Sequence, residues 1–98
     1  MNPKKVRRAS TRSLTDLPNV GPAIAKRLNS IGIDKPSQLE GCDPVELYER
    51  LYKITGKWED PCILDTFISI VRFINGEEAQ VWCAFTAERK HLLESKMT

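Results

Sequence analysis

The stretch of residues 14–33 constrains the fold most, because its caps, prolines and glycines favour one arrangement of the backbone. Ser13 and Asp16 have the spacing of a capping box, in which an acidic side chain reaches back to the start of a helix. Pro18 ends this first element, since its ring and missing N–H cannot continue a helix. Gly32 supplies the stop of a second helix. The sequence therefore predicts a short helix, a tight turn and a second helix.

The turn itself is predicted from a glycine followed by a proline. Gly21 is expected to supply a backbone conformation that is closed to most residues. Pro22 falls at the first helical position, where its missing N–H costs no hydrogen bond. Apolar residues then repeat along one face of an amphipathic helix, at Ile24, Ala25, Leu28 and Ile31.

Two later helices are predicted from an aspartate cap followed by proline, at 43–44 and 60–61. The first is expected to run to about Thr55, and the second to end at Asn75. The second is the most apolar part of the chain, which predicts a central core helix. Its outer side is expected to carry the polar residues Asp65, Thr66, Ser69 and Arg72.

Shorter elements complete an all-α domain of four to six short helices. Residues 36–40 are expected to make one helical turn that buries Leu39. Residues 77–81 are predicted as an irregular connection, and a last helix is expected from about Thr86 to about Ser95. The alternation typical of β-strands is absent.

Composition places this helical domain among soluble cytoplasmic proteins. The chain has 98 residues, enough for one core, and 41% of them are hydrophobic. No run approaches the roughly 18–20 apolar residues of a membrane span, and no secretory signal is apparent. Cys42, Cys62 and Cys83 are odd in number and widely spaced, which favours a reducing cytoplasm over a disulfide framework.

Charge divides the chain into two parts. Residues 1–12 are predicted to be a basic, flexible arm, and residues 13–98 the folded domain. The basic residues of the arm are Lys4, Lys5, Arg7, Arg8 and Arg12. Because the whole chain carries +2, these five charges leave −3 for residues 14–98. A basic arm fits phosphate binding, and a simple solvated leader is the alternative.

The turn resembles the helix-hairpin-helix motif of nucleic-acid-binding proteins. The matching residues are Leu17, Pro18, Val20, Gly21, Pro22, Ala25, Leu28, Gly32 and Ile33. The resemblance implies a SAM-like, helix-hairpin-helix fold. Consecutive backbone N–H groups at a helix start, with the helix dipole, would hold one phosphate without reading sequence. The amides concerned are those of Asn19, Val20, Gly21, Ala23 and Ile24, and Lys26 and Arg27 would bracket neighbouring phosphates.

Two positions depart from the motif. Asn19 replaces the first hairpin glycine, although asparagine tolerates a left-handed conformation better than most residues. Ala23 stands where motifs that grip DNA often have lysine. With one charged phosphate contact fewer, binding is expected to be weak and tolerant of sequence.

Two wider resemblances extend this interpretation. The region after the hairpin is similar to the C-terminal domain of the bacterial RNA polymerase α subunit, at Leu39, Asp43, Pro44, Glu46, Leu47 and Leu51. Nearly the whole chain resembles small bacterial proteins of the pathogenicity-locus or mitomycin-resistance type. Residues that carry this second match include Asn19, Tyr48, Thr55, Gly56, Asp60, Pro61, Cys62, Trp82, Phe85 and Glu88. That resemblance implies a link to DNA damage and repair.

Other chemistry is weaker in the sequence. Cys62 near a predicted helix start could be a reactive thiol, with a small packing residue as the alternative. The cysteines and His91 lack metal-ligand spacing, so no metal site is predicted. Aromatic residues could stack on bases, although packing explains most of them, and Trp58 in a charged loop is the best candidate for exposure.

The predicted function is non-sequence-specific binding of single- or double-stranded DNA, linked to repair or damage resistance. The alternative is a protein-interaction adaptor that uses the same fold without contacting nucleic acid. We expect no enzyme activity, cofactor, membrane association or small-molecule substrate.

Overall fold

The computed structural model describes residues 13–77 and 82–97, which form helices and connecting turns without a β-strand. The elements are η3 (Leu14–Asp16), α1 (Pro22–Ser30), η4 (Pro36–Leu39), α2 (Pro44–Thr55), α3 (Pro61–Ile74), η5 (Trp82–Phe85) and α4 (Thr86–Met97), where η marks a 3-10 helix. The all-α prediction is confirmed, with four α-helices in the described ranges. Each helix there is too short or too polar to cross a membrane. The predicted arm, and most of the predicted irregular connection, lie outside the described residues.

The predicted helix starts and stops are confirmed by their hydrogen bonds. The Asp43 side chain accepts a bond from the Val45 N–H (2.9 Å) and caps α2. Gly56 follows α2 at φ 77°, a left-handed conformation that glycine adopts without strain. At η3, the Asp16 carboxylate accepts a bond from the Ser13 N–H (2.9 Å), as the capping-box spacing predicted.

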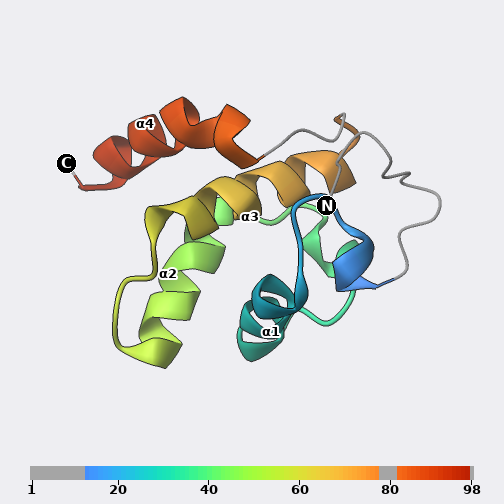
Figure 1. The fold of residues 1–98 in the computed structure, drawn as a ribbon. Helices are drawn as coiled ribbons and strands as arrows, with labels where there is room; N and C mark the ends of the chain where they lie inside the picture. The colour runs from blue at the N-terminus through green and yellow to red at the C-terminus, as the bar shows by residue number, and fades with distance from the viewer. Residues whose placement is uncertain (1–12, 78–81, 98) are drawn as a thin grey trace.

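Helix α3 crosses the middle of the molecule, between α4 on one side and α1 and α2 on the other (Figure 1). Every side chain from residue 64 to residue 71 is buried. The core around α3 includes Leu17 and Val20 from the turn before α1, Leu28 from α1, Leu39 from η4, and Leu47 and Leu51 from α2. Helix α3 is therefore the central core helix that its apolar sequence predicted.

The expected outer side of α3 is wrong at three of its four positions. Asp65, Thr66 and Ser69 are buried. The turn before α1 approaches α3 at Ser69, and α4 approaches it at Asp65, so these positions face other elements. Arg72 is the one that stays partly exposed, and it pairs with Glu88 of α4. Helical periodicity located the apolar stripe, but it could not show that further elements would cover the polar side.

The buried Asp65 carboxylate holds α4 against α3. Its Oδ1 accepts a bond from Arg89 Nε (2.9 Å), and its Oδ2 accepts one from Thr86 Oγ1 (2.8 Å). A fully buried carboxylate is costly unless it is paired and hydrogen-bonded. The first turn of α4 supplies both partners, so the position of α4 depends on this contact.

We expect Arg89→Ala to lower the free energy of unfolding by about 3 kcal/mol, because it leaves a buried carboxylate without its charge partner. Urea unfolding followed by circular dichroism measures the change. Lys90→Ala is the matched control, since Lys90 is exposed on the same helix and its loss should change the value by less than about 0.5 kcal/mol. Equal losses in the two variants would show that Asp65 does not need its partner.

Candidate nucleic-acid interface

In the turn before α1, the left-handed backbone conformation falls on Asn19 and not on Gly21. Asn19 has φ 66°, and it is the one non-glycine residue with positive φ among the described residues. Gly21 has φ −101° and ψ −174°, an extended conformation that any residue adopts. The expectation that Gly21 supplies a restricted backbone conformation is therefore wrong. Asn19 supplies it, and asparagine is one of the few side chains that tolerate it.

Asn19 also fastens the turn to the core. Its Nδ2 donates a bond to Ser69 Oγ of α3 (3.2 Å), and Ser69 Oγ donates in turn to the Thr66 carbonyl (2.7 Å). The neighbouring Leu17 and Val20 are fully buried. The turn is thus attached to the core by a hydrogen bond at Asn19 and by the buried side chains of Leu17 and Val20.

Open space lies in front of Gly21. A Cβ atom built at this position would meet no atom within 4 Å beyond those of Gly21 and its two chain neighbours. Neither the backbone angles nor packing therefore requires glycine here. A glycine that its own fold does not require is suited to a position where a ligand approaches the backbone closely.

The amides of α1 have no side-chain cap. The first intrahelical donor is Ala25 N–H, which bonds to the Gly21 carbonyl (3.0 Å). The N–H groups of Gly21, Ala23 and Ile24 precede it, so the helix itself offers them no acceptor. Among the predicted amide donors, Val20 differs because its N–H bonds internally to the Leu17 carbonyl (3.4 Å).

Helices α2 and α3 are built differently at their starts. Asp43 and Asp60 each accept a bond from a backbone N–H two residues later, at 2.9 Å in both helices. Helix α1 has no such side chain and no acidic residue in its first turn. Its N-terminal partial positive charge is therefore left uncompensated by its own residues.

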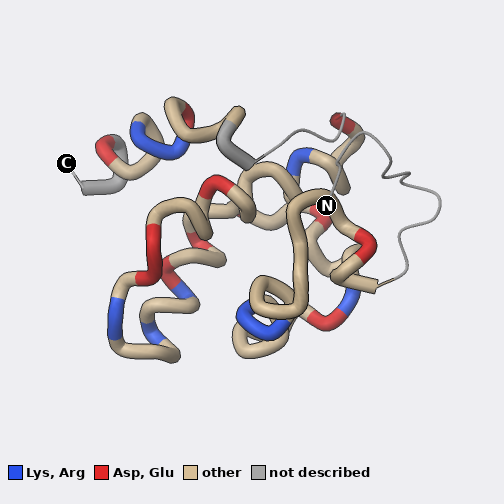
Figure 2. The backbone as a smooth tube through the Cα atoms, in the orientation of Figure 1, with Lys and Arg blue, Asp and Glu red and all other residues tan. Residues whose placement is uncertain are grey.

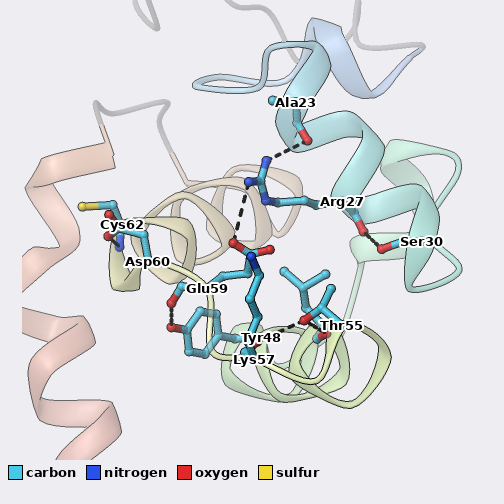
Figure 3. Close-up of polar contacts among 10 residues, drawn as sticks. Ala23, Arg27, Ser30, Tyr48, Thr55, Lys57, Glu59, Asp60 and Cys62 are labelled. Carbon is cyan, nitrogen blue, oxygen red and sulfur yellow. Dashed lines mark hydrogen bonds and ion pairs between the residues drawn. The ribbon is translucent and has the colours of Figure 1, made fainter.

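The two cations of α1, Lys26 and Arg27, differ in their exposure and in their contacts. Lys26 is exposed and lies three residues after Ala23, so both share one face of the helix. Arg27 turns toward the rest of the protein, as Figure 3 shows. Its Nη1 donates to the Ala23 carbonyl (3.2 Å), and its Nη2 lies 3.7 Å from Glu59 Oε2. Lys26 is therefore exposed in the same part of α1 as the open amides, whereas Arg27 already contacts the Ala23 carbonyl and Glu59.

The predicted ligands of the arm, which are Lys4, Lys5, Arg7 and Arg8, lie outside the described residues. Their part in binding stays a prediction. Two polar partners were not foreseen, Glu59 for Arg27 and Ser69 for Asn19. The sequence did offer one signal for the contact between Asn19 and Ser69. Thr66 and Ser69 are polar residues three positions apart on an otherwise apolar helix.

Cys62 lies at the start of α3, where the helix dipole would favour a thiolate. The Asp60 side chain opposes this effect. A hydrogen bond to Asp60 raises the pKa of the Cys62 thiol, and burial and the negative charges of Asp60 and Asp65 raise it further. This environment lowers the fraction of Cys62 that is thiolate at a given pH, which disfavours a nucleophilic role. Among the described residues, no group of histidine, cysteine and carboxylate side chains could hold a metal ion.

Together these features define an all-helical domain with a rigid turn that leads into an uncapped, sterically open helix start. The chain belongs to the family described as Cdd1, pathogenicity locus, whose model matches residues 7–91. It is 48% identical over 80 residues to the mitomycin resistance protein McrB of Streptomyces lavendulae. The aligned region covers 82% of this chain and 76% of the relative. No solved structure matches the chain.

We expect Asn19→Ala to lower the free energy of unfolding by about 1–2 kcal/mol, because alanine is strained in the left-handed region. Asn19→Gly relieves that strain and should cost less, although it also loses the bond to Ser69. Urea unfolding of both variants compares them. If glycine proved as harmful as alanine, the backbone angle would not be what selects asparagine here.

We expect Cys62 to react with iodoacetamide at pH 8 more slowly than free cysteine does. The raised pKa leaves less thiolate at any pH below it. Asp60→Asn should speed the reaction, because it removes the neighbouring charge while asparagine still caps α3. Peptide mass spectrometry separates Cys62 from the other two cysteines. A wild-type rate above that of free cysteine would instead favour thiol chemistry.

Proposed function

We propose that the turn and the start of α1 act as a helix-hairpin-helix phosphate site, and that the protein binds DNA without sequence preference. The observation that carries the proposal is the open N-terminus of α1, where Gly21 is required by neither backbone angles nor packing. In this proposal one backbone phosphate is held by the amides of Gly21, Ala23 and Ile24. Helix N-termini bind such anions through their N–H groups and their dipole.

Charge supports the same assignment. Lys26 is exposed one turn into α1, within reach of a neighbouring phosphate, and the first turn has no carboxylate to repel it. The five basic residues of the arm would add sequence-independent attraction. Contacts of both kinds position a protein on the nucleic-acid backbone and carry no base information.

The name of a relative suggests the biological process in which this DNA binding would act. The 48% identical relative is named for mitomycin resistance. We propose that this chain likewise contributes to resistance to DNA damage, by binding DNA wherever the damage falls. A site that ignores base sequence suits such a task. Survival of a mitomycin-sensitive bacterium that expresses wild-type or variant chain tests this part separately from binding.

The decisive variant is Gly21→Asp. An aspartate at this position can cap α1 by accepting bonds from its amides, so the free energy of unfolding should stay the same or rise by a few tenths of a kcal/mol. The same side chain occupies the amides and repels phosphate, so DNA affinity should fall at least about tenfold. Fluorescence anisotropy with labelled 20-nucleotide single-stranded and duplex DNA, at about 50 mM salt, measures it.

Ser37→Asp is the matched control, since it makes the same charge change at an exposed residue of η4. Equal weakening by the two aspartates would mean that only net charge matters. Lys26→Gln should lower the slope of log affinity against log salt by about one unit. Absence of any binding at about 50 mM salt would reject the proposal and favour the adaptor alternative.

A further inference from the structure

A second surface lies between α2, the loop that leads into α3, and α4. It is a groove of about 620 Å³, within the range of about 300–1,000 Å³ that is usual for binding pockets. We call it the aromatic groove. Its walls include Tyr48 and Glu49 of α2, Trp58, Glu59 and Asp60 of the loop, and Leu93 of α4.

Trp58 is stacked on two tyrosines although it is exposed. Its ring stacks on Tyr52 at a centroid distance of 4.1 Å and on Tyr48 at 5.5 Å. The hydroxyl of Tyr48 donates to the Glu59 carbonyl, which ties the loop to α2 (Figure 3). Nevertheless 57% of Trp58 is open to solvent. An exposed aromatic residue that is already ordered offers contact area at little entropic cost, as the anchor residues of protein interfaces do.

Carboxylates line the aromatic groove, and one of them, Glu59, lies 3.7 Å from Arg27 Nη2. Glu49, Glu59 and Asp60 line the groove, and no lysine or arginine of the described residues does so. Figure 2 shows this acidic stretch where the loop joins α3, beside α2. Burial raises the pKa of Tyr48, the negative charges of Asp60 and Glu59 raise it further, and the positive charge of Arg89 lowers it. Charges of both signs therefore act on Tyr48, and the carboxylates have the larger effect.

We propose that the aromatic groove binds a segment of a partner protein that presents an arginine beside an apolar residue. A guanidinium stacks on aromatic faces and pairs with carboxylates, which are the two kinds of group that this groove combines. The apolar neighbour would cover Leu93. The exposure of Trp58 favours a polypeptide over a small molecule, because pockets for small molecules bury most of their ligand. Three carboxylates disfavour the phosphates of nucleic acid.

The experiment uses the full chain and fluorescein-labelled 12-residue peptides built from the repeat Arg-Leu-Ser, with Gln-Leu-Ser as the uncharged control. Anisotropy at about 50 mM salt should show binding of the arginine peptide and at least about tenfold weaker binding of the glutamine peptide. Trp58→Ala should weaken binding of the arginine peptide about five- to tenfold. Glu49→Gln should also weaken it, without removing an aromatic ring.

Ile54→Ala is the matched control, because Ile54 is 54% exposed on α2 and does not line the groove. Its affinity should stay within about twofold of wild type. Equal affinity for the two peptides, or equal effects of Trp58→Ala and Ile54→Ala, would overturn the proposal. Thermal melts of the variants show whether lost binding reflects lost folding.

Three further results would assign the groove to a different occupant and overturn the proposal. Trp58→Ala could weaken binding of a 12-nucleotide oligothymidylate, which would indicate a base-stacking surface. Self-association that depends on Trp58 would indicate a second copy of this chain. Glutamate in place of Lys4, Lys5, Arg7 and Arg8 could raise affinity for the arginine peptide, which would indicate that the arm of this chain competes for the groove. Unchanged results in all three support a separate partner.

Discussion

Helix α3 is so completely buried that two of its polar side chains, Asp65 and Ser69, take partners from other elements, and these contacts fix the positions of α4 and of the turn before α1. Asp65 takes its partners from the first turn of α4. Ser69 takes Asn19 from the turn before α1. Apolar packing alone would allow either element to slide or rotate, because it is not directional. Hydrogen bonds from a buried helix select one position, since an unpaired group there is costly.

Local signals predicted most of the fold. An aspartate before a proline, or a glycine after an apolar face, acts within a few residues, so the bounds of α2 and α3 followed from the sequence. The polar residues of α3 show the limit of such signals. Asp65 is separated from Arg89 by 24 positions, and Asn19 from Ser69 by 50. Periodicity places these residues on a face of a helix, but only the packing of other elements decides whether solvent or protein covers that face.

The candidate site shows the same limit in finer detail. The sequence located the turn and the start of α1, because proline and glycine mark them, but it did not foresee the internal bond of the Val20 N–H. It was wrong about Gly21, which was expected to be needed for its backbone angles, whereas Asn19 has the left-handed conformation. This result makes Gly21 more informative. A glycine retained for its φ angle says nothing about ligands, whereas one that is free of that demand leaves room for a ligand.

Arg27 connects the two surfaces of the molecule. It extends from the helix that holds the open amides, and its guanidinium lies 3.7 Å from Glu59, which lines the aromatic groove. Because both side chains keep some exposure to solvent, such a pair contributes roughly 0–1 kcal/mol. A phosphate near α1 could therefore draw Arg27 away at little cost, and Glu59 would then present its full charge to the groove. By linkage, an arginine that binds in the groove and neutralises Glu59 would release Arg27 toward the phosphate to the same extent. The contact is thus a physical route by which the two proposed partners would favour each other.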